Sequence, residues 1–383
     1  MNENILTSTT QSPIKVLFVA HEFTRSGAPL ALLEVINALQ ENKYECHLVG
    51  PNGGALDKDI ERLNINRHSI KAINYLYGGG QGRAGQLLYL PLRLIINLFL
   101  SFQILFLFRS IKPQIIHLNS FAARFAAIPT LFCKSKVVWH LHEYYKWDKI
   151  FQTIAAFFVS EVSDEVLVVS SAALVWWSKN RDPRYRVLYG GTEVRDILDH
   201  RHRPYDIVFV GRFSYEKGFF VLLDALSKLQ DIGIRKKVIA VGTHISDETR
   251  SLVHNYLDLK KLSTSIEWIY DSPNPIQYIA QSKVLVLPSL REGLPRVILE
   301  AMSVGTTVVA TNVGGIPEVI NSSDVGILVQ PGNVEQLFQA IVYLLQHEDD
   351  RIKKSIVAHR LLEHHFTLEI FQENIRRIYA QLL

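Results

Sequence analysis

The 383-residue sequence contains only two cysteines, Cys46 and Cys133, which lie far apart in apolar or mixed surroundings. Two separated cysteines cannot build a disulfide framework or supply most ligands of a structural zinc site. We therefore expect a protein of a reducing compartment that holds no metal. The N-terminal stretch MNENILTSTTQSPIK also lacks the apolar run of a secretory signal, so we expect a cytoplasmic location and a poorly ordered segment over residues 1–14.

Acidic residues are missing from a long part of the N-terminal half, since no Asp or Glu occurs between Glu61 and Glu143. The chain has a formal net charge of +4 and this segment carries +10, so the other residues sum to −6. The cations are spread along the segment as Arg62, Arg67, Lys71, Arg83, Arg93, Arg109, Lys112, Arg124, Lys134 and Lys136. They alternate with apolar stretches and form no recognisable nucleic-acid module, so we expect no nucleic-acid partner.

One uncharged run, Leu94 to Phe108 (LIINLFLSFQILFLF), lies between Arg93 and Arg109. It is too short, and too often interrupted by polar side chains, for a confident membrane-spanning helix. Two interpretations stay open. The run is a helix of the protein core, or a helix that also contacts an anionic membrane, where each nearby cation adds about 1 kcal/mol of attraction. One helix can do both, because core and lipid can take different faces.

A dinucleotide-binding motif is excluded by the same lack of acid. Gly80 to Gly85 (GQGRAG) matches the glycine pattern G-x-G-x-x-G. Such a site needs an Asp or Glu about 20 positions later to bind a ribose, and this segment has none. We interpret Gly78 to Gly85 as a loop and expect no NAD.

Apolar, strand-like runs alternate with helical stretches along the chain, in which 48% of residues are hydrophobic and 20% are charged. This composition is ordinary for a globular protein, and the alternation is typical of doubly wound parallel sheets. The expected strands are residues 15–20, 47–50, 115–118, 137–141 and 166–169, then 206–210, 238–242, 266–269, 284–287 and 307–310. We expect an N-terminal domain over residues 15–195, a C-terminal domain over 205–367 and a last helix over 368–383.

The sequence EGLPRVILE carries a carboxylate at each end, Glu292 and Glu300. A helix is expected to begin near Pro295, because proline is tolerated at a helix start. If the rise were helical throughout, the carboxylates would stand about 12 Å apart. The amides of Gly293 and Leu294 lie between them at a helix N-terminus, which attracts anions. This spacing suits a diphosphate with a sugar at each end, although two glutamates near a helix start are also common for dipole reasons alone.

A second charged loop follows the predicted strand 206–210 (DIVFV). Gly211 permits a tight turn, and Arg212 and Lys217 bring two cations to the C-terminal end of that strand. Ligands of open α/β sheets bind at this edge. Taken alone, the two cations would also fit a solvated surface.

Together the two stretches resemble the signature of the retaining glycosyltransferases of family 4. The matching elements are GR-x-x-x-x-KG after one strand and E-x7-E after another. The resemblance implies the GT-B fold, in which two Rossmann-like doubly wound domains face each other across a cleft. It also implies that the N-terminal domain receives the acceptor, that the C-terminal domain binds a nucleotide diphosphate sugar, and that no metal is required.

The resemblance assigns roles to the charged residues of these stretches. Arg212 and Lys217 would hold the donor diphosphate, Glu292 would orient the transferred hexose, and Glu300 would bind the ribose. The backbone of the donor site would come from Gly211, Gly293, Leu294 and Pro295.

Other residues receive roles only through the resemblance. His142 aligns with a histidine near the donor hexose, and His140 is the alternative. Gly27 stands where the family has a glycine pair beside the donor phosphates, although this chain has SGAP instead of the common GGAE. Tyr270 and Asp271 fall in the loop that contacts the base. The turn YGGT departs from the family's Asn-Gly, so no role follows for it.

The sequence therefore predicts metal-independent, retaining transfer of a hexosyl group from a nucleotide diphosphate sugar. A basic, apolar N-terminal domain favours a lipid-linked or polysaccharide-precursor acceptor at an anionic cytoplasmic membrane surface. Three alternatives stay open: a nucleotide-sugar epimerase of the same fold, a non-catalytic nucleotide-sugar-binding subunit, and a basic lipid-binding or nucleic-acid-binding protein.

Overall fold

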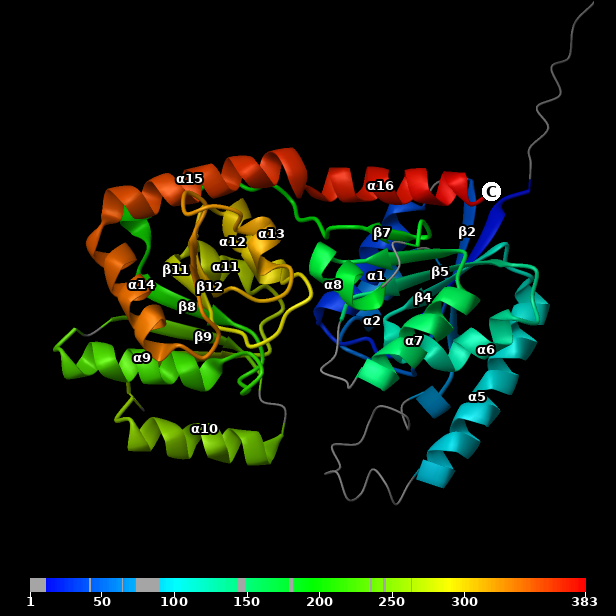
Figure 1. Ribbon diagram of the computed structural model, residues 1–383, viewed down its shortest axis with the longest axis horizontal. Helices are drawn as coiled ribbons and strands as arrows, with labels where there is room; N and C mark the ends of the chain where they lie inside the picture. The colour runs from blue at the N-terminus through cyan, green and yellow to red at the C-terminus, as the bar shows by residue number, and fades with distance from the viewer. Residues whose placement is uncertain are drawn as a thin grey trace, which may run out of the picture. The chain divides into compact units, whose positions relative to one another are not determined.

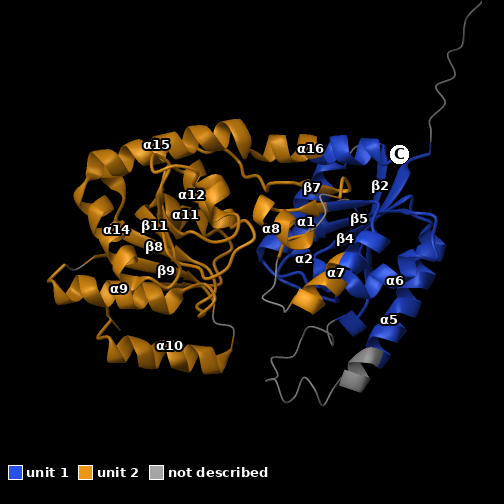
Figure 2. Ribbon diagram, in the orientation of Figure 1, with its two compact units in different colours: residues 1–140, 157–166, 375–383 blue, residues 141–156, 167–374 orange. Residues whose placement is uncertain are grey.

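The computed structural model describes residues 12–40, 43–63, 65–73, 90–143, 149–178, 182–234, 236–243, 246–262 and 264–383. It contains two sheets with helices around them, as Figure 1 shows. The chain divides into two compact units, coloured in Figure 2. Unit 1 comprises residues 1–140, 157–166 and 375–383, and unit 2 comprises residues 141–156 and 167–374. The predicted doubly wound α/β architecture is confirmed, whereas the domain boundaries at residues 15–195 and 205–367 stay predictions.

The first sheet has seven strands in the order β3-β2-β1-β4-β5-β6-β7. They are β1 (Ile14–Val19), β2 (Tyr44–Gly50), β3 (Asn66–Ser69), β4 (Ile115–Asn119), β5 (Lys136–Leu141), β6 (Glu165–Val168) and β7 (Tyr185–Val187). Strand β1 pairs in parallel with both β2 and β4, and its residues 16–19 are fully buried. An uninterrupted apolar run fits this position, because both faces of a central parallel strand are covered.

The helices of this half include one long apolar helix. They are α1 (Gly27–Ala38), α2 (Asp57–Arg62), α5 (Leu90–Ile111), the 3-10 helix η1 (Phe121–Ala126), α6 (Ala127–Thr130), α7 (Lys149–Val162) and α8 (Ser171–Trp177). Helix α5 extends the predicted apolar run at both ends, and Leu100, Ile104 and Phe108 bury one of its faces. The glycine motif at Gly80 to Gly85 lies outside the described residues.

The second sheet has six strands in the order β10-β9-β8-β11-β12-β13, and its neighbours pair in parallel. They are β8 (Tyr205–Val210), β9 (Val238–Gly242), β10 (Ile266–Tyr270), β11 (Ser282–Leu287), β12 (Thr307–Thr311) and β13 (Ile327–Val329). In chain order this is 3-2-1-4-5-6, the order of a Rossmann fold. The direction of winding reverses between β8 and β11, and ligands of such sheets bind beside that reversal.

Helices cover both faces of the second sheet. They are α9 (Phe219–Asp231), α10 (Asp247–Leu259), α11 (Ile276–Ala280), α12 (Arg296–Ser303), α13 (Ile316–Val319), α14 (Val334–Gln346) and α15 (Glu348–His365). The 3-10 helix η2 (His200–His202) precedes β8, and the chain ends in α16 (Leu368–Gln381), whose residues from Ile375 on belong to unit 1. Side chains of successive strand residues pack into the cores on opposite faces of the sheet, because their direction alternates along a strand. Phe209 packs in a core with α9, whereas Val208 packs in a core with α12. None of the helices in the described part of the chain has the length and hydropathy of a membrane span.

Candidate active site

The candidate site lies in unit 2, at the reversal point of the second sheet. Strands β8 and β11 are neighbours, so the loops after their C-terminal ends meet although they are far apart in sequence. The Nζ atom of Lys217, in the first loop, lies 2.7 Å from Oε1 of Glu292, in the second. Two residues that the sequence predicted on separate elements are therefore one ion pair.

The carboxylate of Glu292 is largely withdrawn from water, since only 8% of its surface is exposed. Its Oε1 also accepts a 2.7 Å hydrogen bond from the hydroxyl of Ser289, which is fully buried. The carbonyl of Ser289 in turn accepts a hydrogen bond from Thr311 at the end of β12. A buried carboxylate is tolerated as an anion when cations and hydroxyls compensate its lost hydration, and both are present here.

Close backbone packing positions Lys217. The next residue, Gly218, precedes α9 with φ of 66°. A Cβ atom there would lie 1.8 Å from the carbonyl oxygen of Pro288, in the loop after β11. Only glycine has both the left-handed conformation and the missing side chain that this contact requires.

Arg212 is the second cation of the loop after β8. Its side chain is exposed, and within the described residues it has no ion pair. Arg212 follows Gly211, which has φ of 152°. A Cβ atom at Gly242, the last residue of β9, would lie 1.9 Å from the carbonyl oxygen of Gly211. The two glycines let the loops after β8 and β9 approach, and the Arg212 side chain is exposed beside them.

His142 reaches this site through its backbone. A Cβ at Gly293, directly after Glu292, would lie 2.3 Å from the carbonyl oxygen of His142. The half-buried His142 follows β5, and its amide donates to Oε2 of Glu143 at 3.0 Å. Gly293 also accepts a 2.8 Å hydrogen bond from the amide of Gly315, after β12. Two other segments of unit 2, one after β5 and one after β12, therefore converge on the loop that carries Glu292.

The helix after Glu292 presents its N-terminus to the same loop. Pro295 is its N-cap and forms no side-chain cap hydrogen bond, and the first turn of α12 contains no acidic residue. Leu294 packs on the core below, and the half-buried Glu300 lies one turn inside the helix, as predicted. The positive end of this helix is therefore suited to anionic oxygens.

Two predicted base contacts lie at the edge of the second sheet. Tyr270 is the last residue of β10, so the predicted end of this strand at Ile269 was one residue short. The side chain of Tyr270 is 46% exposed. Asp271 has φ of 50°, and its amide donates to the carbonyl of Gly242 at 3.1 Å. Strand β9 separates β10 from β8, so these residues lie at the outer side of the candidate site.

Gly27 and His140 belong to unit 1. Gly27 is the first residue of α1. His140 is 1% exposed, and the centroid of its ring lies 5.6 Å from that of His117. Nδ1 of His117 is hydrogen-bonded to the hydroxyl of Tyr379 at 2.7 Å. Burial lowers the pKa of His140 to about 3. His140 is therefore a neutral residue of the core, which leaves His142 as the histidine candidate.

Sequence reasoning missed Glu318, which follows the glycine turn after β12. Its carboxylate accepts hydrogen bonds from the amides of Ser171 (2.8 Å) and Ala172 (2.9 Å) and from the hydroxyl of Tyr189 (2.8 Å). An acid at this place compensates the N-terminus of α8. Its sequence signal, the turn GGIPE, revealed nothing of these partners, because they lie far away in the chain.

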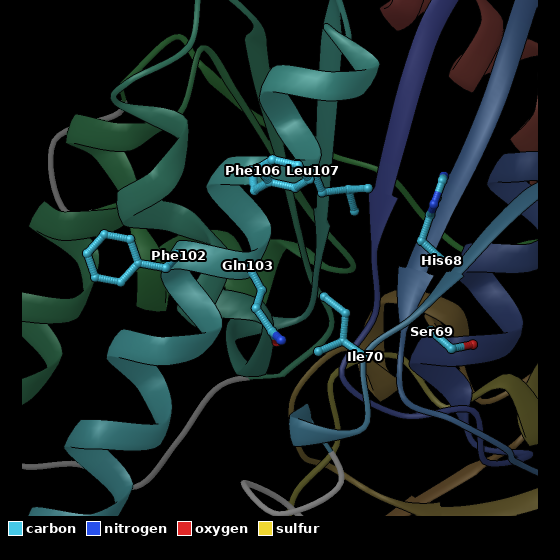
Figure 3. A pocket seen from close by; sticks show the side chains of 7 residues that line it. All are labelled: His68, Ser69, Ile70, Phe102, Gln103, Phe106 and Leu107. Carbon is cyan, nitrogen blue, oxygen red and sulfur yellow. The ribbon is translucent and has the colours of Figure 1, made fainter.

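A pocket of about 590 Å³ lies elsewhere, in unit 1. Figure 3 shows its lining between α5 and the end of β3: His68, Ser69, Ile70, Phe102, Gln103, Phe106 and Leu107. Four of these side chains are apolar and none is charged, unlike the cluster around Lys217. Among the described residues, no group of His, Cys, Asp or Glu could hold a metal ion.

Comparison with known proteins agrees with this geometry. The family Glycosyltransferase Family 4 matches residues 25–196, and the family Glycosyl transferases group 1 matches residues 192–361. The capsular polysaccharide biosynthesis glycosyltransferase CapH of Staphylococcus aureus is 25% identical, over 78% of this chain and 82% of its own length. The putative teichuronic acid biosynthesis glycosyltransferase TuaC of Bacillus subtilis (strain 168) is 29% identical, but over only 41% of this chain and 36% of its own.

Solved structures show the same fold. Anabaena Alr3699/HepE in complex with UDP-glucose superposes with a TM-score of 0.80 at 19% identity, covering 96% of this chain and 100% of that one. A glycosyltransferase from Rickettsia africae ESF-5 superposes with a TM-score of 0.77 at 20% identity, covering 97% and 99%. The predicted GT-B fold is thereby confirmed, and the two family matches together with the relatives show that the chain is a GT-B glycosyltransferase.

Proposed function

We propose that this glycosyltransferase moves a hexosyl group from a nucleotide diphosphate sugar to the precursor of a surface polysaccharide, with retention of configuration. The observation that carries the proposal is the ion pair of Lys217 and Glu292 at the reversal point of the second sheet, with the exposed Arg212 two residues after β8. Two cations and a helix N-terminus surround the position where a diphosphate would lie, and a buried carboxylate stands beside it.

The diphosphate is the leaving group, and charge develops on it as the glycosidic bond breaks. Fixed cations and dipoles that face this charge lower the barrier without reorganising. Arg212 is exposed for this purpose, and Lys217 is held in place by Glu292. Because this chain's own cations supply the positive charge, we propose that turnover needs no divalent metal.

The two glutamates bind the two sugars. Within the described residues, both hydrogen bonds to the Glu292 carboxylate reach Oε1, which leaves Oε2 for a hydroxyl of the hexose. Glu300, one turn into α12, binds the ribose hydroxyls. Neither carboxylate acts as a nucleophile. The acceptor hydroxyl attacks from the face on which the diphosphate departs, and a phosphate oxygen takes its proton, so configuration is retained.

The relatives support the donor and the pathway class. CapH and TuaC are named for capsular polysaccharide and teichuronic acid biosynthesis, and Alr3699/HepE was solved with UDP-glucose. We therefore take a nucleoside diphosphate hexose as donor and a growing polysaccharide or its lipid-linked precursor as acceptor, at the cytoplasmic face of a membrane.

Thermal denaturation with a panel of UDP, GDP, ADP and TDP tests the donor, because a bound nucleotide stabilises the folded state by mass action. One nucleotide is expected to raise the melting temperature of the wild type and to have little effect on Arg212→Ala. Turnover of the matching nucleotide sugar should slow about 10²–10³-fold in Arg212→Ala and in Lys217→Ala. Wild-type turnover in both variants, or an epimerised sugar formed without acceptor, would refute the proposal.

A further inference from the structure

Helix α5 is apolar on two opposite faces. Leu100, Ile104, Phe108 and Ile111 recur at helical spacing and are buried against unit 1. On the other side lie five large apolar side chains that are 56–77% exposed: Ile95, Leu98, Phe99, Phe102 and Phe106. At 100° per residue the two sets point in opposite directions. A helix that is apolar all round is normally buried all round, yet none of the described residues covers the outer face of α5.

A second element adds to this surface. Helix α5 packs on η1 and α6, and the hydroxyl of Ser101 donates to the carbonyl of Phe125 at 3.1 Å. At and after α6, Ile128, Leu131 and Phe132 are 54%, 60% and 65% exposed. We call these three residues and the five of α5 the α5–α6 face. Phe102 and Phe106 also line the pocket in Figure 3, so the face adjoins a hollow.

Cations accompany the α5–α6 face. Arg109 continues the exposed stripe of α5 and acts electrostatically on Cys133, which follows α6. Lys112, Arg124 and Lys134 are exposed as well, and the described residues provide none of these four cations with an ion pair. No carboxylate occurs in the whole segment from residue 62 to 142. Within the described part of the chain, the face is therefore apolar with an uncompensated positive charge.

These features distinguish between the partners that could cover the face. In a symmetric dimer the same patch would meet itself, so its cations would face like charges. An anionic lipid bilayer satisfies both properties, because acyl chains accept the apolar side chains and lipid phosphates attract the cations. Helix α5 has 22 residues and is about 33 Å long, which suits a helix lying in the interface.

We propose that unit 1 docks on an anionic lipid bilayer through the α5–α6 face, with α5 parallel to the membrane plane. The proposal deepens the proposed function, because it brings the enzyme to a lipid-linked acceptor. Its test is separate from donor chemistry, since flotation with vesicles needs no nucleotide and nucleotide binding needs no vesicles.

Flotation of the full chain with vesicles of phosphatidylglycerol and phosphatidylcholine tests the docking. Wild type should float with anionic vesicles at low salt, much less at high salt, and little with phosphatidylcholine alone. Phe102→Ser/Phe106→Ser should weaken the partition at least tenfold, and Lys112→Glu/Lys134→Glu should do so for anionic vesicles. The charge-reversal variant changes only exposed polar side chains, so it keeps the test valid if the first variant folds poorly.

The matched control is Leu252→Ser/Leu259→Ser on α10, whose side chains are 54% and 74% exposed on unit 2. It should float like wild type, and every variant should keep the thermal shift with its nucleotide. Wild type that stays with the soluble fraction, or variants of the α5–α6 face that float like wild type, would overturn the proposal. The proposal would also be overturned if the wild type forms a dimer that does not bind vesicles and both variants of this face are monomeric. That result would assign the face to contact with a second copy of the chain.

Discussion

Replacing Lys217 by alanine is expected to harm both stability and turnover, for reasons that can be separated. The substitution leaves the Glu292 carboxylate, 8% exposed, with Ser289 as its partner. Removing one member of a buried ion pair costs about 3–5 kcal/mol. Since the Lys217 side chain is 23% exposed, water replaces part of its charge, and we expect the low end, about 3 kcal/mol. Losing one group that stabilises the leaving diphosphate should slow turnover about 10²–10³-fold.

A double-mutant cycle distinguishes the two effects. Glu292→Gln removes the uncompensated charge. The loss in free energy of unfolding in Lys217→Ala/Glu292→Gln should therefore be smaller, by about 2 kcal/mol, than the sum of the losses in the two single variants. Turnover should stay slow in the double variant, because no cation has returned to the diphosphate. Urea-induced unfolding and a coupled assay of nucleotide release measure the two quantities on the same protein.

The ion pair of Lys228 and Glu335, also in unit 2, is the control, since its side chains are 47% and 50% exposed. Lys228→Ala should cost less than about 1 kcal/mol and leave turnover unchanged. If Lys217→Ala destabilises no more than Lys228→Ala, the coupling that we attribute to burial is absent. If Lys217→Ala turns over like wild type, Lys217 has no role in the reaction.

Three other substitutions probe the packing beside the site and in the core of unit 1. Gly293→Ala places a Cβ 2.3 Å from a backbone oxygen, so thermal denaturation should show a loss of about 1–3 kcal/mol and a smaller nucleotide shift, whereas Gly190→Ala, with open space around it, should change neither. Glu318→Ala removes three hydrogen bonds and should cost about 2–3 kcal/mol in urea unfolding, against about 1 kcal/mol for Tyr189→Phe; equal losses would contradict this. His140 has a pKa of about 3 when folded, so only the unfolded chain takes up its proton as pH falls from 6.5, and stability should fall by about 2 kcal/mol between pH 6.5 and 5. His140→Gln should remove that part of the pH dependence, and an unchanged slope would show that His140 is not the group responsible.

Most long strands of both sheets were predictable from sequence, because a buried parallel strand is a continuous apolar run bounded by turn residues. Three strands were missed: β3, β7 and β13, with four, three and three residues. Strands this short contain too few residues to show a period. Their strand conformation comes from pairing at a sheet edge, which is a tertiary property.

The position of the candidate residues beside strand ends was predictable, but their arrangement was not. Lys217 and Glu292 were each expected beside a strand end, yet their ion pair follows only from the adjacency of β8 and β11. His140 and His142 could not be separated from sequence, because burial in unit 1 decides between them. The partners of Glu318 are also set by tertiary packing alone.

The two interpretations of the apolar run Leu94 to Phe108 were resolved only in part by the structure. Burial of Leu100, Ile104 and Phe108 confirms the core face. The exposed apolar side chains on the opposite face have no counterpart in a sequence pattern, because a run that is apolar at nearly every position has no measurable amphipathicity.

The central claim is that Arg212 and Lys217 hold a diphosphate whose ribose is bound by Glu300. Calorimetric titration tests it directly, with the nucleoside diphosphate that gives the largest thermal shift and with inorganic pyrophosphate, on wild type, Arg212→Ala and Glu300→Ala. We predict that Arg212→Ala binds both ligands at least tenfold more weakly, whereas Glu300→Ala loses affinity only for the nucleotide. Wild-type affinity of Arg212→Ala for both ligands would contradict the claim.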